Sequence, residues 1–273
     1  MAQPPDSAKR SSLGVRVISA LVLAPIVLGV VWIGGWGLAT LTAAAAVLMS
    51  LEWLRLTGTE RPLWGGAVMI AAALAAILAT ARGEAGVAVA LLGAAALAMT
   101  AVSFAERKQA WIAAGILYLG LPSVALIWLR EPDSEGRQTV LWVLALVWGI
   151  DIGAYFVGRT LKGAKLAPHI SPNKTWSGLC GGIVAAIAVG LGTAALCGAR
   201  PLWLATLSGA LAIVEQAGDL MESAIKRHFQ VKDAGHLIPG HGGLLDRVDG
   251  LIAILVTVAA LALVFGGSPL SWR

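Results

Sequence analysis

Acidic and basic side chains occur at helical spacing within a stretch that is otherwise apolar, residues 202–227. Glu215, Asp219, Glu222 and Lys226 follow one another at intervals of four, three and four residues. Side chains at these intervals share one face of an α-helix, so they form a polar stripe about 16 Å long. One interpretation is a structural ladder in which Glu222 pairs with Lys226 one turn away. Three carboxylates against one lysine leave that ladder unbalanced, which favours a site that a cation completes.

A glycine-rich loop follows the stripe. Gly242 and Gly243 permit close approach of the backbone to phosphate oxygens, and exposed backbone amides can form an anion-binding concavity. Asp246 and Asp249 carry the oxygen ligands that a hard divalent cation prefers. We expect His241, inside the loop, to contact phosphate or support the loop rather than to act as a general base. The loop and the stripe together indicate chemistry on phosphate groups.

A second polar region lies earlier in the chain. Asp151, Tyr155 and Arg159 are spaced by four residues, so they share one face of a predicted helix. Ionisable side chains within membrane spans are costly and usually mark a functional site. The loop after this helix, residues 162–178, adds lysines, hydroxyl groups and glycines, among them Ser171, Lys174 and Thr175.

The composition indicates a membrane protein. Of 273 residues, 58% are hydrophobic and only 13% are charged, whereas soluble domains carry about a quarter charged residues. So little polar surface excludes a water-soluble globule. We therefore predict an all-α, polytopic membrane protein with about nine transmembrane helices, each about 20 residues long. The predicted spans are residues 17–35, 38–56, 64–81, 85–105, 111–130, 139–161, 179–198, 202–227 and 249–267.

Three regions are expected along the chain. Residues 1–14 form a disordered cytosolic tail, residues 15–138 an N-terminal transmembrane scaffold, and residues 139–273 a C-terminal transmembrane catalytic region. The first five spans have almost no polar residues in their interiors. Glu52 and Trp53 stand at the cytosolic end of the second span, where we expect them to contact lipid headgroups rather than to take part in catalysis.

Lysines and arginines divide unequally between alternate loops. With nine spans, fifteen of the 20 fall on the side of the N-terminus, and short cytoplasmic loops are enriched in these residues. The N-terminus and the loops 162–178 and 228–248 are therefore expected in the cytoplasm, with Arg273 outside. The net charge of +5 suits contact with anionic lipid and phosphorylated substrates. No nucleic-acid partner is expected.

The polar motifs resemble those of the phosphatidate cytidylyltransferase family. The resemblance rests on Ser223 with Lys226 and Arg227, on Lys232 with Asp233, and on the run from Pro239 to Asp249. Residues 216–223 and 171–175 also look like family motifs, as does Asp151 with Tyr155, Gly158 and Arg159. Asn173 departs from the basic residue that many relatives have at that position. The recognisable motifs lie between about residues 150 and 250.

The resemblance implies an enzyme of phospholipid biosynthesis in the bacterial inner membrane. Such an enzyme transfers CMP from CTP to phosphatidic acid, releases CDP-diacylglycerol and pyrophosphate, needs Mg²⁺ and tends to form homodimers. We predict that Asp219, Asp246 and Lys226 are catalytic. The predicted metal ligands are Asp219 and Asp246, with Asp249 and Glu222 as additions. The predicted substrate-binding residues are Ser171, Lys174, Thr175, Arg227, Lys232, His241, Gly242, Gly243, Arg247, Asp151 and Arg159.

Two rival functions use similar residues. A CTP-dependent kinase or cytidylyltransferase acting on a polyprenyl or archaeal lipid would need the same phosphate-binding groups. A cation-coupled transporter would also place carboxylates in its helices, but it would carry inverted repeats and broken helices near the bilayer midplane. Here the polar residues and glycine-rich loops concentrate toward one surface, which favours an enzyme.

Overall fold

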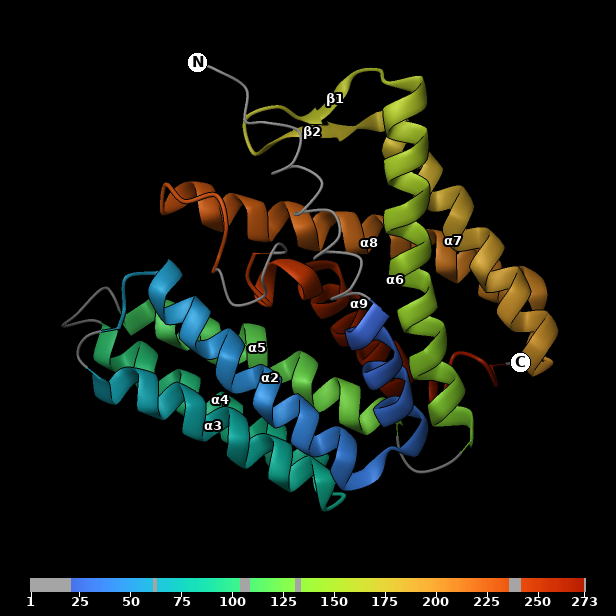
Figure 1. Cartoon of the computed structure of the whole chain (residues 1–273). Coiled ribbons are helices and arrows are strands. Elements are labelled where there is room, and N and C mark those ends of the chain that lie inside the picture. Colours follow the sequence, from blue (N-terminus) through green and yellow to red (C-terminus); the bar gives the residue numbers. More distant parts are fainter. Residues whose placement is uncertain (1–20, 61–62, 104–108, 131–133, 236–241, 273) are drawn as a thin grey trace.

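The computed structural model describes residues 21–60, 63–103, 109–130, 134–235 and 242–272. These residues are almost entirely helical, so the all-α prediction is confirmed (Figure 1). The ends of α2–α9 lie within five residues of the predicted spans. The helices are Leu21–Ile33, α2 (Gly35–Leu56), α3 (Leu63–Ala81), α4 (Ala85–Ser103), α5 (Gln109–Arg130), α6 (Ser134–Leu161), α7 (Trp176–Cys197), α8 (Pro201–His228) and α9 (Leu245–Phe265).

The chain is an integral membrane protein. Among the described residues, seven helices are long and apolar enough to cross a membrane, namely α2–α7 and α9. The helix Leu21–Ile33 is apolar but shorter. Although α8 has 28 residues, it is not among the seven, because its polar stripe lowers its hydropathy. The count remains roughly consistent with the nine predicted spans.

The helices form two groups, and α9 contacts both of them (Figure 1). In one group α2, α3, α4 and α5 pack against one another, and in the other α7 packs between α6 and α8. Leu245 and Ile252 of α9 belong to the hydrophobic core of the first group. Ile254 and Val258 belong to the core of the second. The helix α9, which follows the glycine-rich loop, therefore joins the two groups of helices.

Small residues bring α6 and α7 close together. A Cβ added at Gly181 would lie 2.4 Å from the Cβ of Val157, and one added at Gly153 would lie 2.6 Å from that of Ala185. Small residues are typical of helix contacts in membranes, where van der Waals packing replaces the hydrophobic effect as the driving force. This packing holds the polar face of α6 beside the start of α7.

A β-hairpin precedes α7 and was not predicted. β1 (Lys165–Ala167) pairs antiparallel with β2 (Ser171–Thr175). Its turn is closed by a hydrogen bond from the Ile170 amide to the Ala167 carbonyl, 3.1 Å long, with Pro168 at the position where β-turns favour proline. Thr175 ends β2 and caps α7, because its side chain accepts a hydrogen bond from the Gly178 amide at 3.1 Å. Lys174 is thereby held at a rigid strand–helix junction.

The close contact between α6 and α7 yields a first prediction. Gly181→Ala should destabilise the protein by about 1–3 kcal/mol, since the new methyl group overlaps Val157. Gly192→Ala is the matched control in the same helix, because no described atom lies within 4 Å of its added Cβ. It should leave the protein unchanged or stabilise it by up to about 1 kcal/mol through helix propensity. Thermal unfolding in detergent measures both, and equal melting temperatures for the two variants would contradict the packing argument.

Candidate active site

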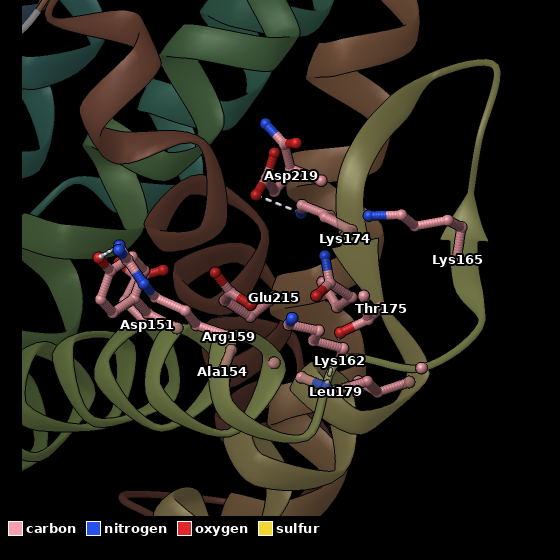
Figure 2. A pocket seen from close by; sticks show the side chains of 16 residues that line it. Asp151, Ala154, Arg159, Lys162, Lys165, Lys174, Thr175, Leu179, Glu215 and Asp219 are labelled. Carbon is pink, nitrogen blue, oxygen red and sulfur yellow. Dashed lines mark hydrogen bonds and ion pairs between the residues drawn. The ribbon is translucent and has the colours of Figure 1, made fainter.

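A cavity of about 800 Å³ lies between α6, the hairpin, the start of α7 and the middle of α8 (Figure 2). Its size falls within the usual range for small-molecule sites. Charged side chains from four segments of the chain line it. They are the cations Arg159, Lys162, Lys165 and Lys174 and the carboxylates Asp151, Glu215 and Asp219. The cavity is therefore suited to a ligand with several negative charges that also brings or accepts a cation.

The α6 wall of the cavity carries the predicted polar face. Asp151, Tyr155 and Arg159 all line the cavity. The Arg159 guanidinium donates a hydrogen bond of 2.5 Å to the Tyr155 hydroxyl, which restrains the arginine beside the opening. Their spacing of four residues predicted this shared face correctly.

On the opposite wall, Lys174 of the hairpin pairs with Asp219 of α8 (Figure 2). Asp219 also accepts a hydrogen bond of 3.3 Å from the Ser223 hydroxyl. Glu215, one turn before Asp219, lines the cavity and is 4% exposed. The ion pair fixes both partners and links the motif of residues 171–175 to the polar stripe.

A second charged cluster lies further along α8. The Lys226 ammonium donates to Glu222 at 3.0 Å and to Asp246 at 2.7 Å, and all three side chains are buried or nearly so. The Glu222–Lys226 pair of the structural ladder is therefore present, but Asp246 of α9 joins it. Asp246 also accepts hydrogen bonds from the amides of Ala234, at 3.0 Å, and Gly243, at 2.9 Å. Its carboxylate thus ties both sides of the glycine-rich loop to α8.

The comparisons with known proteins decide the family. A model described as the cytidylyltransferase family matches residues 14–265. The chain belongs to this family. It is 43% identical over 263 residues to a phosphatidate cytidylyltransferase of Brucella suis biovar 1 (strain 1330), with 94% of each chain covered. It is 37% identical over 271 residues to a protein of the same name from Pseudomonas aeruginosa, covering 93% of this chain and 98% of the relative.

A third relative, the phosphatidate cytidylyltransferase of Bacillus subtilis (strain 168), is 40% identical over 157 residues, which is 56% of this chain and 58% of the relative. The family resemblance predicted from the motifs is confirmed. The Brucella and Pseudomonas matches extend it to the N-terminal helices, where the sequence offered only hydrophobic spans.

The remaining predicted site residues lie around these two clusters. Arg227 donates to the carbonyls of Ile170, at 3.3 Å, and Val231, at 3.2 Å, so it links α8 to the turn of the hairpin. Ser171 is half-buried in β2, and Lys232 and Arg247 are exposed. Gly242 has a positive φ of 86°, which favours glycine, and His241 lies outside the described residues.

Two findings about site residues depart from the sequence analysis. Glu215, Lys162 and Lys165 line the cavity, although the sequence analysis assigned them no site role. Glu215 could have been predicted, because it lies on the same helical face as Asp219.

The expectation that Glu52 and Trp53 contact headgroups is wrong. Glu52 is 0% exposed and Trp53 is 1% exposed, because Glu52 accepts hydrogen bonds from backbone amides and Trp53 donates to the Trp111 carbonyl.

A divalent cation needs several oxygen ligands that converge on one point. Within the described residues, no group of three or more histidine, cysteine, aspartate or glutamate side chains is arranged to hold a metal ion. Carboxylate oxygens are the ligands that a hard cation prefers, but Asp219 is paired with Lys174, and Glu222 and Asp246 are paired with Lys226.

Proposed function

We propose that the chain is a phosphatidate cytidylyltransferase, which transfers CMP from CTP to phosphatidic acid and yields CDP-diacylglycerol and pyrophosphate. The observation that carries this proposal is the near full-length similarity to curated relatives of that name. The cavity lined by four cations adds physical support, because a nucleoside triphosphate brings several negative charges to one place.

The proposed reaction forms one P–O bond and breaks another. A phosphate oxygen of phosphatidic acid attacks the α-phosphorus of CTP, and the bond from that phosphorus to the bridging oxygen of pyrophosphate breaks. A phosphomonoester already carries roughly 1.5 to 2 negative charges near neutral pH, so the nucleophile needs little help from a general base. The larger barrier is the repulsion between two polyanions and the charge on the leaving pyrophosphate.

The lysines of the two clusters suit that electrostatic task. Lys174 is fixed by Asp219 at the edge of the cavity, and Lys226 is fixed by Glu222 and Asp246. A cation held in place by carboxylates does not need to reorganise as negative charge develops on a phosphate. Arg159, Lys162 and Lys165 supply further positive charge around the same cavity.

We also propose a Mg²⁺ requirement. Asp219 and Asp246 would hold the ion, with Asp249 and Glu222 as additional ligands. Mg²⁺ bound to these residues would screen the phosphate charges and stabilise the leaving pyrophosphate. The support is that α8 and the first turns of α9 together carry five carboxylates, Glu215, Asp219, Glu222, Asp246 and Asp249.

The identity of the reaction is tested with labelled nucleotide. Purified protein should transfer label from [α-³²P]CTP to phosphatidic acid, and no label from [γ-³²P]CTP should reach the lipid. A kinase would give the opposite pattern, because it transfers the γ-phosphoryl group. Polyprenyl phosphate and an archaeal ether lipid serve as alternative acceptors, and preferential labelling of either would contradict phosphatidic acid as the substrate.

The assignment of the carboxylates predicts different effects for two variants. Asp219→Asn should lower kcat by about 100-fold or more, since it removes charge from the site, while the melting temperature changes little. Asp246→Asn should lower both kcat and the melting temperature, because an amide group cannot accept both loop amides and Lys226.

Turnover and melting temperature should be measured together across a Mg²⁺ titration. The matched control is Glu60→Gln, which neutralises an exposed carboxylate whose ion-pair partner, Arg55, is also exposed. If the stripe were only a structural ladder, Asp219→Asn would lower stability and retain near-normal turnover at low Mg²⁺.

The proposed orientation puts the loops 162–178 and 228–248 in the cytoplasm of a bacterial inner membrane, because fifteen of 20 basic residues fall on that side. CTP would then enter from water while the acyl chains of phosphatidic acid stay in the bilayer. We propose a homodimer, following the family resemblance.

Single-cysteine labelling tests the orientation in a Cys180→Ser, Cys197→Ser background. Asp233→Cys and Arg200→Cys both replace exposed residues, on opposite predicted sides of the membrane. An impermeant maleimide should label position 200 in spheroplasts with intact inner membranes and position 233 only after permeabilisation. Labelling of position 233 without permeabilisation would reverse the proposed orientation.

A further inference from the structure

Glu52 lies in α2, nearly two hundred residues before the glycine-rich loop in sequence, yet its carboxylate contacts that loop. The side chain is 0% exposed. One oxygen accepts a hydrogen bond of 2.9 Å from the Leu244 amide, and the other accepts one of 2.8 Å from the Leu245 amide. Both donors stand where the loop ends and α9 begins.

This contact replaces a cap that α9 lacks in its own sequence. The first amides of a helix have no partner within the helix, and a nearby side chain usually accepts from them. Leu244 occupies the N-cap position of α9 and can make no side-chain cap. Glu52 supplies the acceptors from another helix, and its negative charge lies at the positive end of the α9 dipole.

The loop is shaped to receive this carboxylate. A Cβ added at Gly235 would lie 2.6 Å from one Glu52 oxygen, and a Cβ added at Gly243 would lie 2.9 Å from the other. These glycines stand on the two sides of the loop. Any larger residue at either position would displace Glu52 or the backbone. The Glu52 carboxylate therefore fits beside the loop only because positions 235 and 243 are glycines.

Glu52 and Asp246 hold the same two sides of the loop. Asp246 accepts from the amides of Ala234 and Gly243, each adjacent in sequence to a residue that Glu52 contacts. Asp246 also follows Leu245 directly and holds Lys226 at 2.7 Å. A shift of the first turn of α9 would therefore move the Asp246 carboxylate and, through it, the Lys226 ammonium.

We infer that Glu52 is a positioning residue for cytidylyl transfer, which fixes the first turn of α9 and thereby aims Asp246 and Lys226 at the reacting phosphates. The inference rests on the proposed function. Errors of about 1 Å in a catalytic group lower rates by about 100-fold, so the contact affects turnover beyond its contribution to stability. The described residues lining the cavity come from α6, residues 162–163 after it, the hairpin, α7 and α8, so CTP binding there should depend little on Glu52.

The test compares Glu52→Gln with Glu52→Asp. Gln keeps the volume of the side chain but offers one acceptor to two amides, whereas Asp keeps both acceptors and the charge but leaves a gap of one methylene. We expect kcat per folded protein to fall at least tenfold in Glu52→Gln and less in Glu52→Asp, with KM for CTP within about threefold of wild type. Ser50→Ala, at another fully buried position of α2, is the matched control and should keep wild-type kcat.

Assays well below each melting temperature separate positioning from stability. If Glu52 serves packing alone, Glu52→Gln will equal or exceed Glu52→Asp, or the folded variants will share the wild-type kcat, and either result overturns the inference. A rise in KM for CTP with unchanged kcat overturns it as well. A wild-type protein that forms no liponucleotide would instead overturn the proposed function, and the inference with it.

A second variant covers the case in which Glu52→Gln does not fold. Gly243→Ala should lower kcat at least tenfold, because its added Cβ would lie 2.9 Å from both a Glu52 carboxylate oxygen and the Gly235 amide nitrogen and would separate Glu52 from the loop. Gly93→Ala, with no described atom within 4 Å of the added Cβ, should not. If Glu52 acts through the loop, Glu52→Asp combined with Gly243→Ala should lose little more than the worse single variant. Losses that multiply would show two independent effects and refute the coupling.

Discussion

The Lys226 ammonium is the point at which α8, α9 and the glycine-rich loop are joined. It is buried between the carboxylates of Glu222 and Asp246, and a charge taken out of water costs several kcal/mol unless it is paired and hydrogen bonded. Asp246 in turn needs the amides of Ala234 and Gly243 to satisfy its remaining lone pairs. Each group is tolerated in the interior only because the others are present, so the cluster assembles as a unit.

The same requirement explains why the N-terminal helices matter to the site. The amides at the start of α9 are buried and need acceptors, and Glu52 of α2 provides them. Trp53, the next residue, fills the core beside it and donates to the Trp111 carbonyl at 2.8 Å. The helices α2–α5 are therefore more than a membrane scaffold, since a carboxylate of α2 contacts the segment that carries Asp246.

The cavity depends on a different kind of contact. Gly153 and Gly181 let α6 and α7 approach closely, which sets the polar face of α6 opposite the stripe of α8. The hairpin then spans the space between them and delivers Lys174 to Asp219. Thr175 makes this geometry rigid by ending the strand and capping α7 in a single residue. Close helix packing and a capped junction therefore place charges from four segments around one space.

The sequence by itself determined the features that repeat over short distances. Apolar runs of about 20 residues predicted the helices, and spacings of three and four residues predicted the shared face of Asp151, Tyr155 and Arg159 and the stripe on α8. Both follow from helix geometry and the thickness of the bilayer, which require no knowledge of the rest of the chain. The motifs around residues 150–250 indicated the family, because they too are local features of the sequence.

Only the tertiary structure decided which charges meet. Asp219 and Asp246 were both predicted to be catalytic metal ligands, yet one pairs with Lys174 of the hairpin and the other with Lys226 of α8. Glu52 looked like an interfacial residue because a carboxylate at the end of a span can reach water; its true partners, the amides of Leu244 and Leu245, lie nearly two hundred residues away. Backbone amides carry no residue-specific signal in the sequence, so a contact to them becomes visible only when helices from both halves of the chain are packed together.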